Sequence, residues 1–230
     1  MNVTGADFPY ALSMSDIDSI QAGTKHSYAD IPLVSLDIET DTSGGGGLDP
    51  HTSRVVAASL AYSGTDKVEV FDSGSEAETL QSLESILAKR NGLLITWNGA
   101  GFDLPFLSRR YQFSDMTTSL RVAPDPTIPV KYPPPPGLGI PVRASWGSLA
   151  HVDISYLYAG VAREGNVKWS LKSIAKYLGY SPVEVDRARV HALTPEDLRK
   201  YVASDAVVTV ELAQLLRPQI LVRCIPFMNL

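Results

Sequence analysis

Three short acidic motifs follow one another along the chain, and each places a carboxylate within an apolar pattern. They are Leu36–Thr40 (LDIET), Asn98–Asp103 (NGAGFD) and Tyr201–Asp205 (YVASD). Burying several carboxylates together is unfavourable unless cations compensate their charge. We therefore expect the three motifs to form one metal site, in which two divalent ions would support the cleavage of phosphodiesters.

The first motif ends a strand pattern over residues 33–39. Side chains alternate along a strand, so Asp37 and Glu39 share one face, while Leu36 and Ile38 share the other. An Asp-x-Glu pair alone is weak evidence for a metal site, because it often ends a strand without any chemical role. Here it precedes a glycine-rich loop over residues 41–53, the position at which α/β sheets place their ligands.

The second motif follows the apolar run Leu93–Trp97 and leads into a helix predicted over residues 104–111. Asp103 alone could be the N-cap of that helix. Capping does not explain why Asn98 and Phe102 accompany it, since an amide suits the edge of a sugar and an aromatic ring suits a stacked base. The motif therefore predicts substrate contacts beside a metal ligand.

The third motif lies in a helix predicted from Pro195 to Leu216, with Thr194 as its N-cap. Apolar residues recur along it at helical spacing, and Asp205 falls in the same stripe, one turn after Tyr201. The tyrosine could be core packing alone. A buried aspartate needs a compensating partner, which metal ions would supply.

The other patterns complete a mixed α/β fold. Apolar alternation and helical spacing predict strands at 33–39, 54–62, 67–71, 93–97 and 151–156, and helices at 76–89, 104–111, 170–178 and 195–216. We expect a ribonuclease H-like mixed sheet of five strands with helices on both faces.

Proline content and periodicity divide the chain further. Eight prolines between residues 115 and 150 predict an extended insertion, either a loop over the site or a Pro-rich ligand for a partner. Residues 1–30 are expected to form an arm and residues 31–217 the folded domain. The tail at 218–230 could pack on the domain, bind another protein or lead into a longer chain.

The net charge and its distribution along the chain bear on how the protein could bind nucleic acid. The net charge of −5 disfavours a protein that coats nucleic acid nonspecifically. Residues 104–180 nevertheless hold nine basic and four acidic side chains. This segment either is a solvated surface or contacts backbone phosphates, and Lys172 and Lys176 are the lysines expected to touch the substrate.

No apolar run reaches the roughly 18 residues of a membrane span, and residues 1–20 show no basic or apolar leader. We expect a soluble cytoplasmic protein. The single cysteine, Cys224, cannot form an internal disulfide and is interpreted as a buried thiol. The histidines lack the spacing of zinc ligands and are interpreted as ordinary; they are His26, His51, His151 and His191.

In this order, the three motifs resemble those of the DEDD 3′-5′ exonucleases of the ribonuclease H-like superfamily, in the subgroup with Tyr in the third motif. The resemblance extends over about residues 33–216 and is closest to the proofreading exonuclease domain of family B DNA polymerases. The histidine subgroup fits less well, because Lys200 stands five residues before Asp205.

The resemblance implies how the carboxylates share the ions. Asp37, Glu39 and Asp205 would hold one divalent cation, while Asp37 and Asp103 would hold the second, partly through water. Tyr201 would orient the attacking water. Mg²⁺ or Mn²⁺ suits a site built from carboxylates alone.

The residues around these ligands receive supporting roles. We expect Thr40, Asn98 and Phe102 to contact the substrate. Asp153, at the end of a predicted strand, is expected to support the site from behind the ligands.

The expected function is metal-dependent hydrolysis of single-stranded DNA from the 3′ end to nucleoside 5′-monophosphates, by a monomer, in DNA repair or proofreading. The same chemistry on RNA stays open. So does a non-catalytic nucleic-acid-binding module, although the intact acidic set argues against it. A chain of 230 residues leaves no room for a polymerase, so we do not expect proofreading within the same chain.

Overall fold

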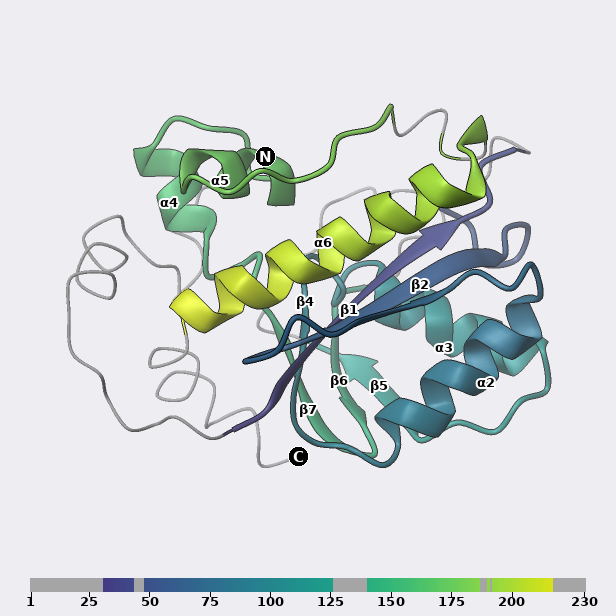
Figure 1. Cartoon of the computed structure of the whole chain (residues 1–230). Coiled ribbons are helices and arrows are strands. Elements are labelled where there is room, and N and C mark those ends of the chain that lie inside the picture. Colours follow the sequence, from purple (N-terminus) through teal and green to yellow (C-terminus); the bar gives the residue numbers. More distant parts are fainter. Residues whose placement is uncertain (1–30, 44–47, 126–139, 187–189, 191, 217–230) are drawn as a thin grey trace.

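The computed structural model describes residues 31–43, 48–125, 140–186, 190 and 192–216. Figure 1 shows a central sheet with helices packed against it. The elements, in chain order, are β1 Leu33–Thr40, β2 Val55–Tyr62, β3 Val68–Phe71, α2 Glu76–Leu87, β4 Asn91–Thr96, α3 Asp103–Phe113, β5 Leu120–Pro124, β6 Val142–Trp146, β7 Ser148–Asp153, α4 Ala159–Glu164, α5 Leu171–Tyr177 and α6 Pro195–Leu215. The predicted arm, the tail and the centre of the Pro-rich insertion lie outside the described residues.

The sheet is mixed, and within the described residues it has seven strands in the order β3-β2-β1-β4-β7-β6-β5. β1 pairs with β4 and β4 with β7 in parallel, whereas the other neighbours are antiparallel. The parallel strands therefore end at one edge of the sheet, where the first acidic motif forms the end of β1 and the second motif follows β4.

The prediction of five strands is wrong, because β5 and β6 lie inside the segment interpreted as an extended insertion. Their apolar residues alternate, as in Leu120 and Val122, but the surrounding prolines obscured this pattern. Pro124 ends β5, which is the edge strand of the sheet, and Pro141 precedes β6. Proline is tolerated at such positions because no ladder hydrogen bond is lost there.

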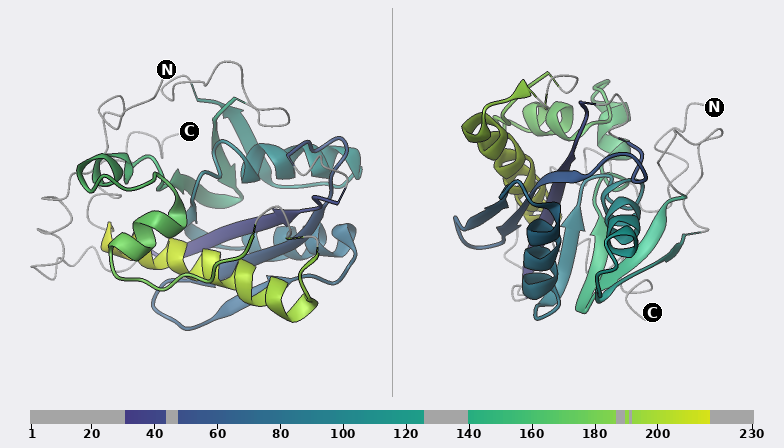
Figure 2. Two further views of the ribbon diagram at one scale, coloured as in Figure 1. Left: turned by 90° about the horizontal axis from the view of Figure 1, so that it is seen from above. Right: turned by 90° about the vertical axis from the view of Figure 1, so that its right-hand side faces the viewer.

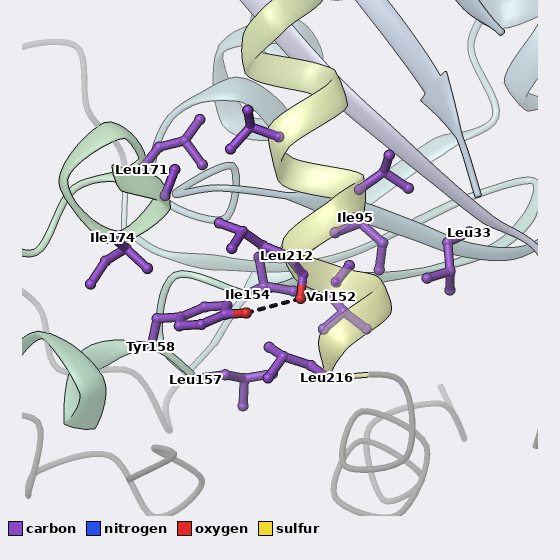
Figure 3. Packing of buried hydrophobic residues seen from close by; sticks show 14 of the residues in the cluster. Leu33, Ile95, Val152, Ile154, Leu157, Tyr158, Leu171, Ile174, Leu212 and Leu216 are labelled. Atoms are coloured by element: carbon purple, nitrogen blue, oxygen red, sulfur yellow. Dashed lines mark hydrogen bonds between the residues drawn. The ribbon is translucent and has the colours of Figure 1, made fainter. Parts of the chain in front are cut away.

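Both faces of the sheet are covered, as predicted. α4, α5 and α6 pack on one face against Leu33, Ile95 and Val152 (Figure 3). α2 and α3 pack on the opposite face against side chains that include Leu36 and Leu94. Figure 2 shows these helices in layers on either side of the strands. The alternation of β1 is confirmed, because Val34, Leu36 and Ile38 all belong to the α2–α3 side.

Two small polar side chains fix α6 on the sheet. The hydroxyl groups of Ser35 and Ser59, both fully buried, donate to the carbonyl oxygens of Ala206 and Val202, each at 2.7 Å. A serine occupies little volume, so the helix backbone can approach the strands closely. Thr194 caps α6 as predicted, since its side chain accepts a hydrogen bond from the backbone N–H of Asp197.

Glu84 ties α2 to the outer strands. Its carboxylate accepts hydrogen bonds from Trp146 Nε1 at 2.8 Å, from Thr118 Oγ1 at 2.7 Å and from the backbone N–H of Ser119 at 2.9 Å. The strand pair β5–β6 is thereby part of the core and not a loop over the site. The short helix α4 was not predicted from the sequence. Among the described residues, no helix has the length and apolar character to cross a membrane.

Candidate active site

Three carboxylates from two elements meet beside the end of β1. Asp37 and Glu39 extend from β1 and Asp205 from α6, and one oxygen of each lies within 4.8 Å of the others. The pairing of β1 with β2 explains why these carboxylates lie close together. Asp37 lies opposite Ser59 of β2, and the hydroxyl group of Ser59 donates to the carbonyl oxygen of Val202 in α6. The structure thus brings the first and third motifs together.

Burial makes this cluster electrostatically unfavourable without a cation. Burial raises the pKa of Asp37 well above its usual value, and the neighbouring charges of Asp205, Glu39 and Asp103 raise it further. The ammonium group of Lys172 acts in the opposite direction. Asp37 Oδ2 is buried and makes no hydrogen bond within the described part of the protein, so a cation bound there would satisfy it.

Lys172 lies inside the cluster. Its Nζ is 3.1 Å from Asp205 Oδ1 and 3.9 Å from the centre of the Tyr201 ring, and it donates to the carbonyl oxygen of Val183 at 2.5 Å. Its side chain is 12% exposed. The predicted contact of Lys172 with the substrate stays a prediction, and its contact with a carboxylate was not predicted. Lys172 in α5 and Asp205 in α6 are far apart in the sequence, so no sequence pattern predicts this ion pair.

Asp103 lies next to the cluster and connects the second motif to the first. It is the first residue of α3, and its Oδ1 accepts a hydrogen bond from the backbone N–H of Ile38 at 3.3 Å. Burial raises the pKa of Asp103 to about 7; the charge of Asp153 adds to the rise, while hydrogen bonds from the Asp103 and Ile38 backbone oppose it. The alternative reading of Asp103 as an N-cap is wrong, because Phe102 holds that position.

Asp153 shapes the loop of the second motif. Its Oδ1 accepts from the Asn98 backbone N–H at 2.9 Å, its Oδ2 accepts from the Ala100 N–H at 3.0 Å, and both the N–H and the hydroxyl of Ser155 donate to Oδ1. The backbone of Asn98 has φ of 65°, a conformation that such fixed contacts stabilise. Asp153 therefore fixes the backbone of the loop that leads to Asp103, and its support of the metal ligands stays a prediction.

The other predicted substrate residues differ in position. Thr40 is buried at the end of β1, and the ring of Phe102 is half-buried against Phe106, with centroids 5.4 Å apart. Lys176 pairs with Glu184 at the surface, at 2.6 Å, so it does not join the cluster. Tyr201 is only 2% exposed and lies beneath Lys172.

His151, which was interpreted as ordinary, lies in β7 and outside the carboxylate cluster. Burial lowers its pKa to about 3, and its Nε2 lies 2.8 Å from Thr96 Oγ1.

The loop of the second motif passes so close to Thr96 that a Cβ at Gly99 would collide with the Thr96 side chain. Gly99 is therefore needed because the backbone passes close to the side chain of Thr96.

The donor set fits a hard divalent cation. The cluster offers carboxylate oxygens and no nitrogen or sulfur, which favours Mg²⁺ or Mn²⁺ over zinc. The buried oxygen of Asp37 and the mutual repulsion of the carboxylates are both relieved by such an ion. Asp103 does not belong to this set of three, but its charge contributes to the raised pKa of Asp37.

Comparisons with known proteins agree with this architecture. The family B DNA polymerase from the hyperthermophilic archaeon Pyrobaculum calidifontis matches with a TM-score of 0.60 at 24% sequence identity, over 82% of this chain and 25% of the polymerase chain. The chain thus spans about a quarter of that polymerase. No curated protein sequence matches significantly. A profile of the RNase H superfamily matches residues 34–192, more than half of the sequence. The chain therefore belongs to the RNase H superfamily.

Proposed function

We propose that the protein is a metal-dependent 3′-5′ exonuclease of the DEDD type that degrades single-stranded DNA to nucleoside 5′-monophosphates. One observation carries the proposal: Asp37, Glu39 and Asp205 present oxygens within 4.8 Å of one another at the edge of the sheet where the second motif also ends. Such a cluster has no structural benefit of its own, since its charges repel.

Asp37, Glu39 and Asp205 would hold one cation, and Asp37 with Asp103 a second. When bound, the cations supply water activation and stabilisation of the charge that develops on the leaving 3′-oxygen. The protein contributes rigidity, because β1 and α6 are joined through Ser35 and Ser59. The ligands are thus held in place before the ions arrive.

Two further residues have roles in this proposal. Tyr201 lies one turn before Asp205 on α6, and its phenol orients the attacking water. Lys172 partly compensates Asp205 when no cation is present and can turn toward a phosphate when cations take over that charge. Asp153 positions Asn98 and Ala100, which form the wall facing the terminal nucleotide.

The shared fold with a DNA polymerase supports DNA as the first substrate to test. Trimming of 3′ ends is the reaction that proofreading and DNA repair require, and it is the activity we assign to this chain.

The experiment uses a single-stranded DNA oligonucleotide labelled at its 5′ end, incubated with Mg²⁺ or Mn²⁺ and, in parallel, with chelator. We expect a ladder that shortens from the 3′ end, stops with chelator and is absent in Asp205→Asn. An RNA of the same sequence should be cut more slowly. Shifted but uncut oligonucleotide would instead indicate a binding module, and equal cleavage of RNA would contradict the assigned substrate.

A further inference from the structure

The segment 180–186, called the strap from here on, leaves the end of α5 and runs along α6 without regular secondary structure (Figure 1). Most of its side chains are exposed, with Val183 exposed to 39%, whereas Pro182 is buried. A segment with few buried apolar side chains has low local stability, so its polar contacts matter for its position. None of the roles proposed above uses the strap.

Two hydrogen bonds at Val183 hold the strap to the helices beside it. The backbone N–H of Val183 donates to the hydroxyl oxygen of Ser204 at 2.9 Å, and the carbonyl oxygen of Val183 accepts from Lys172 Nζ at 2.5 Å. Ser204 belongs to α6 and Lys172 to α5. Glu184 of the strap also pairs with Lys176 of α5, but at the surface, where an ion pair contributes little. Val183 therefore lies between a residue of the third acidic motif and the lysine of the carboxylate cluster.

These contacts close a ring through the cluster. Lys172 Nζ also lies 3.1 Å from Asp205 Oδ1, and Asp205 directly follows Ser204 in α6. The ring thus runs from α6 to the strap, from the strap to Lys172, and from Lys172 back to α6. One ammonium group contacts both the strap and a proposed metal ligand, so the two contacts depend on the same position of Nζ.

A divalent cation in the cluster would compete with Lys172 for the same carboxylate. The oxygens that Asp37, Glu39 and Asp205 present lie within 4.8 Å of one another, and Lys172 Nζ contacts that cluster at Asp205. The lysine side chain is 12% exposed, so water screens little of the repulsion between its charge and a bound cation. A lysine that leaves Asp205 for this reason also gives up the position from which it donates to Val183.

We propose that the strap and Lys172 form a latch that is closed in the metal-free protein and opens when the carboxylate cluster binds a divalent cation; this proposal rests on the metal site of the function given above. Ser204 is a positioning residue of the latch, since it holds Val183 where Lys172 reaches both the strap and Asp205. The closed latch favours the lysine over the cation and so lowers the affinity of the cluster for metal. By linkage, cation binding loosens the strap by the same factor.

Ser204→Ala removes the acceptor of the Val183 N–H and leaves every carboxylate of the cluster in place. We expect the affinity for Mn²⁺, measured by calorimetric titration, to rise roughly 2- to 10-fold, the range that the loss of one hydrogen bond gives. In the Lys172→Met background the same substitution should change the affinity by less than about twofold, because no lysine is left for the strap to hold in the cluster. Ser85→Ala, at an exposed serine of α2, is the matched control and should leave the affinity unchanged.

Amide hydrogen exchange measures the strap itself. Addition of Mn²⁺ should accelerate exchange of the Val183 amide severalfold in the wild type and should leave it unchanged in Lys172→Met. Unchanged or slower exchange in the wild type with Mn²⁺ would overturn the latch. This experiment needs no Ser204 variant, so it tests the latch even if Ser204→Ala does not fold.

The calorimetric results separate the latch from the exonuclease proposal. Equal or weaker Mn²⁺ binding by folded Ser204→Ala, or a gain that persists in the Lys172→Met background, would show that the latch is wrong and would leave the metal site intact. A wild type that binds no Mn²⁺ would overturn the metal site together with the latch. Thermal melts in chelator check that the variants are folded.

Discussion

The ammonium group of Lys172 lies 3.1 Å from Oδ1 of Asp205, inside a cluster of carboxylates that a divalent cation would otherwise compensate. The side chains of the two residues are 12% and 6% exposed, so the pair is screened little by water. The lysine comes from α5 and the aspartate from α6, and the contact therefore joins two helices as well as two charges.

Lys172→Met removes this compensation and leaves Asp205 buried beside like charges. We expect the metal-free protein to lose about 3 kcal/mol of stability, the scale for losing one partner of a buried ion pair. Mn²⁺ should restore the stability and should bind more tightly than to the wild type, because a competing cation is gone. Calorimetric titration and thermal melts measure both effects. Weaker Mn²⁺ binding in the variant would show that Lys172 supports the ligands instead.

Folding raises the pKa of Asp103 to about 7 from the usual value of 3.8. Between these two values the unfolded chain releases its proton more readily than the folded one. The stability of the metal-free protein should therefore fall as pH rises from about 4 to 7 and level off above. Melts across this range in chelator, with and without Mg²⁺, check the effect, and Mg²⁺ should reverse it near pH 7.

Asp103→Asn removes one titrating group and should weaken this dependence, while the raised pKa of Asp37 accounts for the part that is left. Asp66→Asn, in an exposed turn, is the matched control and should leave it unchanged. A wild-type stability that rises between pH 4 and 7 in chelator would contradict the raised pKa.

Asp153→Asn keeps the size of the side chain but replaces one acceptor oxygen by an amide nitrogen, so it cannot hold both Asn98 and Ala100. We expect kcat to fall roughly 10- to 100-fold, the range for residues that orient metal ligands from behind. Hydrogen exchange at the Asn98 amide should accelerate in the variant. Unchanged exchange together with normal kcat would reduce Asp153 to a core residue.

Much of the site followed from the sequence because its signals are local. The alternation of β1 placed Asp37 and Glu39 on one face, and the spacing along α6 placed Tyr201 below Asp205; the structure brings Asp37, Glu39 and Asp205 together. The contact of Lys172 with Asp205 could not be predicted, because the two residues are distant in the chain. The strands β5 and β6 were not predicted, because prolines at strand ends resemble loop residues when the neighbouring strand is unknown.

Tyr201→Phe retains the buried ring and removes only the hydroxyl. If the phenol orients the attacking water, single-turnover cleavage should slow by roughly 10- to 1000-fold. Mn²⁺ affinity should stay near that of the wild type, because the phenol is not a proposed ligand. Unchanged cleavage would make Tyr201 a packing residue, and lost metal binding would make it a support for Asp205.

We propose that Asp37, Asp103 and Asp205 act together through divalent ions in the hydrolysis of DNA. It is tested most directly by measuring the release of nucleoside 5′-monophosphate from single-stranded DNA, as Mn²⁺ is titrated, for the wild type and for each Ala variant. We predict Mn²⁺-dependent release by the wild type and none above background by folded Asp37→Ala, Asp103→Ala or Asp205→Ala. Near-normal release by any one of these variants would show that its carboxylate does not hold a catalytic ion.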